Sequence, residues 1–183
     1  MPQPPKISAE TVIQHALTLL ERSGEAALSL RALAAGLGVT PNALYWHYAD
    51  REALLGALAA HGADELRRAL RAAFPEGAQE LADLTPLAHR YLHFARSRPH
   101  LYALLTAPQR DPAVSAGLWA DVTTMLAPFV GADRAPEVGV ALWAYLHGAA
   151  GLEGMGAFHQ GKPQTGLEAG LRALLGGFSE PRP

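Results

Sequence analysis

Residues 29–55 contain two short helical patterns that meet at Gly38, and this junction constrains the fold more than any other part of the chain. The first pattern begins at Ser29 and ends at Gly38, because glycine is the residue that best accepts a positive φ. The second begins at Thr40, with Pro41 at the first helical position, where an N–H is not needed. Two short helices joined by a turn of about three or four residues predict a helix-turn-helix, whose second helix lies in the major groove of DNA.

The composition is that of a globular chain with one or two domains. Of its 183 residues, 49% are hydrophobic and none is cysteine, which excludes disulfides, thiolate metal sites and a cysteine nucleophile. The first residues lack the apolar core of a signal peptide. The most apolar stretch, residues 139–152, is too short for a membrane span and contains His147. We therefore expect a cytoplasmic protein that does not enter a membrane.

The charge balance argues mildly against a nucleic-acid partner. The net charge is −2, and the first 60 residues contain no basic patch. The charged residues of this segment are Lys6, Arg22, Arg31 and Arg51 against Glu10, Glu21, Glu25, Asp50 and Glu52. Any contact with DNA must therefore come from a few well-placed groups.

The hydrophobic pattern is helical throughout, without the alternation typical of strands. We expect a first helix over residues 8–23 and a fourth from Asp50 to about Ala73, after which residues 74–77 break the pattern. Later helices are expected to begin at Thr85, near Pro99, at Asp111, at Asp133 or Ala135, and after a loop over residues 161–166. The prediction is an all-α fold: a DNA-binding domain over residues 1–60, a linking helix to about residue 74, and a second helical domain over residues 75–183.

The third helix has two different faces. Leu44 and Tyr48 are four residues apart and are expected to face the core, whereas Asn42 and Tyr45 lie on the opposite, polar side. Asparagine can bond adenine edges, and tyrosine can contact a phosphate or a thymine methyl group. The alternative is that the aromatic run over residues 45–48 is a core cluster. We accept that alternative for Tyr48 and reject it for Tyr45, because Tyr45 shares the polar face.

Two arginines occupy positions that do not favour helix stability. Arg51 begins the fourth helix and Arg31 lies in the first turn of the second, where the helix dipole disfavours a cation. A contact with a DNA phosphate would explain both. The alternative for Arg51 is a solvated arginine paired with Glu52 or Asp50.

Residues 8–60 resemble the N-terminal DNA-binding domain of the TetR family of bacterial regulators. The matching elements are Ser29-Leu30-Arg31-Ala32-Leu33-Ala34, Leu37-Gly38-Val39-Thr40, Ala43-Leu44-Tyr45-Trp46-His47-Tyr48 and Arg51-Glu52-Ala53-Leu54-Leu55. The Tyr-Trp-His form is particularly similar to the tetracycline-repressor branch.

This resemblance implies a homodimer whose two third helices contact the half-sites of a palindromic double-stranded DNA operator. It implies phosphate contacts from Arg31, Thr40, Tyr45, His47 and Arg51, and base contacts from Pro41, Asn42 and Ala43. By helical spacing, Trp46 flanks the polar face that carries Asn42 and Tyr45. Because Pro41 and Ala43 lack polar side-chain atoms, methyl contacts and DNA shape are expected to contribute to specificity.

The C-terminal two-thirds resemble the regulatory half of the family more loosely, which implies an internal effector pocket and a pair of dimer-forming helices. Ala144, Gly148, Gly151 and Met155 form a stripe of mostly small residues at i, i+4, i+7 and i+11. Glycines destabilise a helix by about 1 kcal/mol each, so tight packing must offset them. We interpret this helix and the last one, with Leu167, Leu171 and Leu174, as half of an intersubunit four-helix bundle. The alternative is tight packing inside one subunit.

Bulky residues on separate helices are candidates for the pocket, and three histidines could orient a ligand. The set is Tyr91, Phe94, Tyr102, Trp119, Met125, Phe129, Trp143 and Phe158, with His89, His93 and His147. Each aromatic residue could instead be plain core, so the set indicates a small, mostly apolar effector or none.

Together with these patterns, the resemblance to the TetR family implies a ligand-responsive, dimeric repressor with no catalytic residues and no cofactor. His89 and His93 have a spacing able to bind a divalent metal, but no third ligand is evident, so we expect no metal site. The rival interpretations are a helical enzyme or metal-binding protein centred on the histidines, and a regulator that has lost its effector site.

Overall fold

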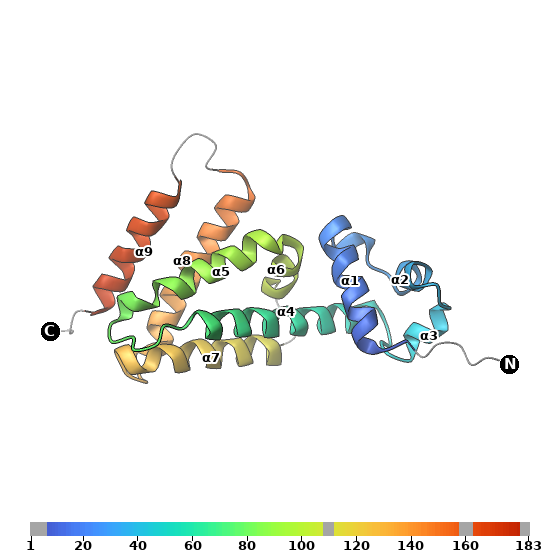
Figure 1. The fold of residues 1–183 in the computed structure, drawn as a ribbon, viewed down its shortest axis with the longest axis horizontal. Helices are drawn as coiled ribbons and strands as arrows, with labels where there is room; N and C mark the ends of the chain where they lie inside the picture. The colour runs from blue at the N-terminus through green and yellow to red at the C-terminus, as the bar shows by residue number, and fades with distance from the viewer. Residues whose placement is uncertain (1–6, 108–111, 158–162, 180–183) are drawn as a thin grey trace. The chain divides into compact units, whose positions relative to one another are not determined.

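The computed structural model describes residues 7–107, 112–157 and 163–179, and these ranges are helical without a strand, as predicted (Figure 1). The helices form two compact units. Unit 1 comprises residues 1–64 and 98–114, and unit 2 comprises residues 65–97 and 115–183. The long helix α4 (Arg51–Ala73) contributes residues to both.

Unit 1 contains α1 (Ala9–Ser23), η1 (Glu25–Ala27), α2 (Leu30–Leu37), α3 (Pro41–Tyr45), the first part of α4 and α6 (Pro99–Thr106). Its helices begin at the predicted caps. The hydroxyls of Ser8 and Ser29 accept hydrogen bonds from backbone N–H groups at 3.1 Å, and the Asp50 carboxylate accepts one from Ala53 at 2.8 Å. Gly38 ends α2 in the left-handed conformation, with φ 68° and ψ 28°.

The core of unit 1 consists of leucine and valine side chains on the inward faces of these helices. Fully buried members are Val12 and Leu20 of α1, Leu33 of α2, Leu44 of α3 and Leu54, Leu55 and Leu58 of α4. Burial of each leucine side chain stabilises the folded state by about 1.5–3 kcal/mol. Because α3 has only one buried residue, its position depends on Leu44 and on its short connections.

Helix α6 joins unit 1 although it is distant in the sequence. The Glu21 carboxylate accepts hydrogen bonds from the backbone N–H groups of Leu101 (3.0 Å) and His100 (3.4 Å), which lie in the first turn of α6. A negative charge at a helix N-terminus is favourable. Gly62 of α4 allows the close approach of Leu101, since a Cβ there would lie 3.0 Å from the leucine side chain.

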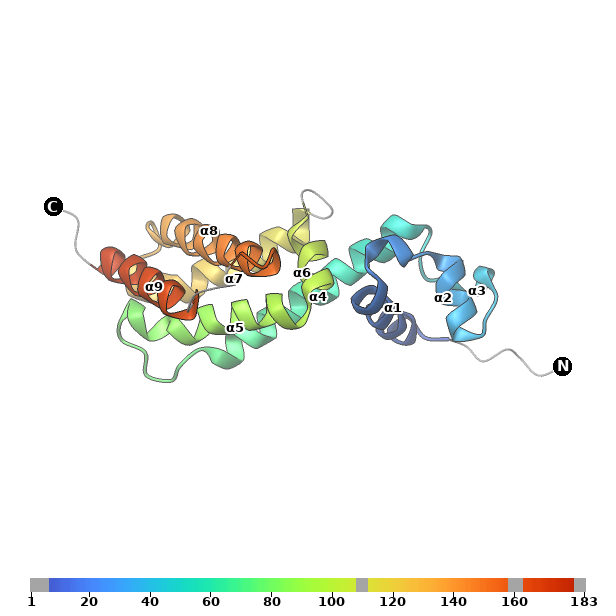
Figure 2. The same ribbon diagram turned by 90° about the horizontal axis from the view of Figure 1, so that it is seen from above.

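Unit 2 contains the rest of α4, η2 (Leu81–Leu84), α5 (Thr85–Ser97), most of α7 (Pro112–Val130), α8 (Ala135–Gly154) and α9 (Pro163–Ser179). Within it α5 packs on α8, and α9 packs on α8 and η2 (Figures 1 and 2). The last helix begins at Pro163, inside the stretch that we expected to be a loop, because proline is tolerated in the first turn of a helix. None of the helices in the described ranges has the length and hydropathy needed to cross a membrane.

Candidate nucleic-acid interface and cavities

Helix α3 presents its polar side to solvent. Leu44 is completely buried, whereas Tyr45 is 50% exposed and Trp46 is 88% exposed. Pro41 and Asn42 are also exposed, and Ala43 is half-buried. Because exposed aromatic residues of this size are costly to leave in water, the surface is typical of a binding site.

Tyr48 lies on the other side of α3, half-buried as its spacing from Leu44 indicated. Burial, together with the nearby Glu10 carboxylate, raises the pKa of the Tyr48 phenol. Tyr48 is therefore a structural residue, in contrast to Tyr45.

The residues around α3 that we expected to bind phosphate differ in the hydrogen bonds that they make within the chain. Arg31 and Thr40 are exposed, and the Thr40 hydroxyl makes no capping hydrogen bond to α3, unlike the hydroxyls of Ser8 and Ser29. The exposed His47 ring is held through Nε2, which lies 2.9 Å from the Ile7 carbonyl oxygen. The contacts of these residues with DNA stay a prediction.

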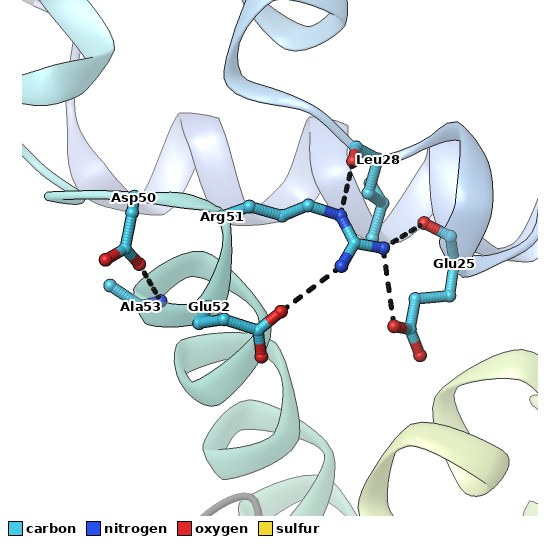
Figure 3. Close-up of polar contacts among 6 residues, drawn as sticks. All are labelled: Glu25, Leu28, Asp50, Arg51, Glu52 and Ala53. Carbon is cyan, nitrogen blue, oxygen red and sulfur yellow. Dashed lines mark hydrogen bonds and ion pairs between the residues drawn. The ribbon is translucent and has the colours of Figure 1, made fainter.

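The Arg51 guanidinium makes hydrogen bonds and ion pairs with other residues of unit 1 (Figure 3). Its Nε donates to the Leu28 carbonyl (2.9 Å) and its Nη2 donates to the Glu25 carbonyl (2.9 Å) and lies 3.3 Å from the Glu25 carboxylate. Its Nη1 pairs with Glu52 at 3.3 Å, while Asp50 caps α4 instead. The guanidinium therefore fastens the segment between α1 and α2 to the start of α4. The pairing with Glu52 that we left open is present, and a phosphate contact would have to compete with these bonds.

Unit 2 contains an ion cluster that the sequence pattern did not reveal. Arg67 and Arg71, one turn apart on α4, both donate to the Asp121 carboxylate of α7, with Arg71 at 2.9 Å. The Asp121 side chain is 17% exposed. The hydrogen bond from Arg67 is the main reason that the pKa of Asp121 lies below its ordinary value, with Arg71 adding to the effect. The cluster holds α4 against α7.

A first cavity, of about 90 Å³, lies inside unit 2 and is almost entirely apolar. Its wall includes Leu70 of α4, Tyr91 of α5, Met125 of α7 and Trp143 of α8. Three of the expected ligand-binding residues, Tyr91, Met125 and Trp143, therefore come together here.

A second cavity, of about 240 Å³, lies among α5, α8 and α9 and is lined by His89 and His93 together with Leu92, Arg96 and Glu168. These two histidines are thus separated from the aromatic candidates. No group of three or more metal-binding side chains that could hold an ion occurs within the described residues.

The remaining pocket candidates line neither of these cavities. Phe94 is buried, Phe129 packs on Phe74 with ring centroids 6.2 Å apart, and Trp119 packs against Gly139. Tyr102 is buried in unit 1, where α6 packs on α1. His147 is exposed beside Trp143, with ring centroids 5.7 Å apart. Phe158 lies outside the described residues.

One face of α8 is exposed and apolar along its length. This α8 stripe consists of Val140, Trp143, Ala144, His147, Gly148, Gly151, Leu152 and Met155. It contains all four small-stripe residues that we expected at a dimer interface.

The leucines expected to join that interface from α9 behave differently. Leu171 is only 3% exposed and lines both cavities, Leu167 lines the second cavity, and Leu174 is half-buried. The apolar side of α9 therefore packs inside its own unit, and the assignment of these leucines to a dimer interface stays a prediction. The exposed side of α9 carries small residues such as Ala169, Ala173 and Gly176.

Comparison with known proteins decides the family. The model of the bacterial regulatory proteins of the tetR family matches residues 12–58, and the model of the tetracyclin repressor-like C-terminal domain matches residues 84–174. The chain belongs to the TetR family. Members of this family are DNA-binding transcriptional regulators rather than enzymes, and the helix-turn-helix formed by α2 and α3 is the DNA-binding element.

Three relatives of this TetR-family regulator show how far the similarity extends. An uncharacterised HTH-type regulator of Mycobacterium tuberculosis is 30% identical over 82% of this chain and 72% of its own length. The class A tetracycline repressor of Escherichia coli is 50% identical, but over only 30% of this chain and 25% of its own length. A solved TetR variant from Acinetobacter baumannii in complex with minocycline is 25% identical, with a TM-score of 0.71 over 94% of this chain and 96% of that one.

The contacts of Arg51 predict an unusual salt dependence for a TetR-family arginine. We expect Arg51→Gln to weaken operator binding about tenfold, because hydrogen bonds from a charged donor are worth about 1.5–3 kcal/mol and the segment between α1 and α2 loses its anchor. The slope of log K against log salt concentration should stay unchanged, because the substitution removes no charge that neutralises a phosphate.

Binding titrations at several salt concentrations check this expectation, with Arg31→Gln as the matched comparison. Arg31 is exposed, so its replacement should reduce the slope by about 0.9 for each phosphate that the protein no longer neutralises. An equal reduction of the slope in Arg51→Gln would show that Arg51 leaves its intramolecular partners and binds phosphate.

The low pKa of Asp121 predicts how the stability of the regulator depends on pH. Because the folded-state pKa lies below that of the unfolded chain, the ion cluster stabilises the fold at neutral pH and this contribution is lost as the pH falls below about 4. We expect Asp121→Asn to lower the free energy of unfolding by about 1–2 kcal/mol at pH 7.

Denaturant unfolding at pH 7 and at successively lower pH measures this difference between wild type and Asp121→Asn, which should shrink with acidity. Asp133→Asn, at an exposed position in the α7–α8 turn, is the control and should change little at any pH. A difference that stays constant down to a pH of about 3 would contradict the assignment of the effect to the Asp121 charge.

Proposed function

We propose that this TetR-family regulator is a cytoplasmic homodimeric repressor that a small, mostly apolar effector releases from a palindromic operator. The observation that carries the proposal is the apolar cavity of unit 2, because Leu70 of α4 forms part of its wall. Helix α4 continues from that cavity to Arg51, which anchors the segment before the helix-turn-helix. A ligand in the cavity would therefore touch the helix that leads to the DNA-binding residues.

The proposal also needs two copies of the chain, and the α8 stripe supports this. Val140, Trp143, Leu152 and Met155 are between 43% and 74% exposed on one helix face, which is unusual for a surface that stays in water. Small residues between them would let a second helix approach closely. A two-fold axis through such a patch brings the same surface of each copy together, as in most homodimers.

Effector response requires a difference in affinity between two states of the dimer. A ligand shifts the DNA-binding equilibrium only if it binds one arrangement of α4 and α7 better than the other. The first cavity supports such a difference, since its wall includes residues from both helices and would change if they moved. The solved TetR variant that holds minocycline has a similar fold, which supports a ligand-binding role for the C-terminal unit here.

Selection of genomic DNA fragments by the purified protein, followed by footprinting of the best fragment, tests this function. We expect one protected palindrome whose two halves lie about one helical turn apart. No enrichment even at low salt, where phosphate contacts are strongest, would refute the proposed operator binding. Protection that no compound relieves would instead indicate a regulator without an effector.

A further inference from the structure

We infer that the effector is amphipathic, with an apolar body in the first cavity and a head group carrying hydrogen-bond-accepting oxygen in the second. This inference rests on the proposed function and specifies the ligand class of that site. Its starting observation is that Leu146 of α8 and Leu171 of α9 line both cavities. The two spaces are therefore neighbours that share a partition of two side chains.

A ligand could displace the two leucine side chains that separate the cavities. Leu146 and Leu171 are 9% and 3% exposed, and they come from two different helices. Leucine side chains can change rotamer, whereas moving a backbone wall would require a whole helix to shift. Rotation of either leucine would open a passage between the cavities.

The volumes of the two cavities favour one ligand site that includes both over a separate ligand site in each. An apolar cavity of about 150 Å³ can hold a benzene ring. The first cavity, at about 90 Å³, is smaller than that, so a phenyl ring would need the extra space that displacement of Leu146 or Leu171 opens. Sites for small organic ligands usually have about 300–1,000 Å³. The two cavities together reach the lower end of this range.

The walls differ in chemistry in a way that orients a ligand. The first cavity is formed almost entirely by apolar atoms, so a charge there would lose its hydration without compensation. The second cavity has a floor that includes Leu92 and Leu167 and presents the exposed imidazoles of His89 and His93. A neutral imidazole has one N–H donor, which can bond an oxygen atom of a head group.

The other polar groups of the second cavity are the guanidinium of Arg96, the hydroxyl of Tyr145 and the carboxylate of Glu168. Arg96 donates to Glu153 at 2.7 Å, and the Tyr145 hydroxyl donates to the Leu167 carbonyl at 2.6 Å. The remaining carboxylate is that of Glu168. The donors that a ligand meets without breaking either of these bonds are therefore the two histidines and the Nη groups of Arg96. These donors favour an oxygen head group, whereas Glu168 would attract an ammonium head group.

Four probes with the same apolar body test the inference by calorimetric titration of the whole protein: butylbenzene, 4-phenyl-1-butanol, 4-phenylbutyrate and 4-phenylbutylamine. We expect the alcohol or the carboxylate to bind at least about tenfold more tightly than butylbenzene, which corresponds to one added hydrogen bond. The comparison between alcohol and carboxylate shows whether the head group is neutral or charged. Tightest binding by the amine would overturn the inference and assign the head-group contact to Glu168.

The double variant His89→Ala with His93→Ala should remove this tenfold advantage and leave the affinity for butylbenzene unchanged. Arg90→Ala is the matched control, because Arg90 is exposed on the same helix and lines neither cavity. An advantage that survives in the double variant, and also after Arg96→Gln is added to it, would overturn the inference. If butylbenzene binds and releases the operator but a head group adds nothing, the amphipathic effector is wrong while the proposed function stands. If no probe binds and a broad compound screen never releases the operator, the proposed function itself fails.

Discussion

Tyr45→Ala is expected to weaken binding to the operator by about 100-fold while the fold and the assembly of the protein stay unchanged. Tyr45 is 50% exposed on α3, so its ring makes few contacts that hold the helix in place. A dimer carries two copies, and the loss of about 1–2 kcal/mol at each half-site gives this factor. Titration of the footprinted operator measures the affinity, and thermal unfolding measures the fold.

The matched control for this variant is Gln14→Ala, which removes an exposed side chain of the same unit that bonds Glu10 at 2.8 Å on α1. It should bind the operator with wild-type affinity. Unchanged binding by Tyr45→Ala would show that the exposed face of α3 does not contact the bases or their phosphates. A large drop in its melting temperature would place Tyr45 in the core instead, contrary to its exposure.

The elements of the fold that could be predicted are those that neighbouring residues determine. Ser8, Ser29 and Asp50 begin their helices, as expected, because a cap bonds a backbone group only about three residues away. The two faces of α3 were likewise predictable from the spacing of Leu44 and Tyr45. In each case the physical cause lies within one or two helical turns.

The features that could not be predicted depend on partners far away in the chain. Arg51 was expected to contact a phosphate because the helix dipole disfavours a cation at the start of α4. In the structure, the backbone carbonyl groups of Glu25 and Leu28 accept hydrogen bonds from its guanidinium instead. In the same way, no local pattern connects Asp121 with Arg67, 54 residues earlier. In the sequence, the spacing of Arg67 and Arg71 places two arginines one turn apart on α4, but this spacing does not identify Asp121 as the carboxylate that binds them.

The pocket residues were only partly predictable, because the walls of a cavity come from helices that are far apart in the sequence. Helical spacing shows which residues share a face, but it does not show which other helix covers that face. Tyr91 and His89 are two residues apart on α5 and therefore line different cavities. Tyr102 was grouped with them as a bulky residue on a separate helix, yet α6 packs on α1 within unit 1.

Gly151→Arg is expected to separate the proposed dimer into monomers and to weaken operator binding by roughly 100-fold or more. Gly151 belongs to the α8 stripe, and an arginine there would place a charge and a long side chain where two helices should meet. A monomer holds only one half-site, so it forfeits the gain in affinity that comes from linking two binding modules. Light scattering after size-exclusion chromatography measures the mass, and titration of the operator measures the affinity.

The same substitution should leave the single subunit intact, which makes the result specific to the interface. A Cβ at Gly151 meets no atom within 4 Å, so the new side chain has room in the isolated chain. Replacing a helical glycine should even stabilise α8, by up to about 1 kcal/mol. Ala120→Arg, at an exposed position of α7, is the control for an added arginine. If Gly151→Arg stays dimeric and binds the operator normally, the α8 stripe is not the surface that joins the two copies.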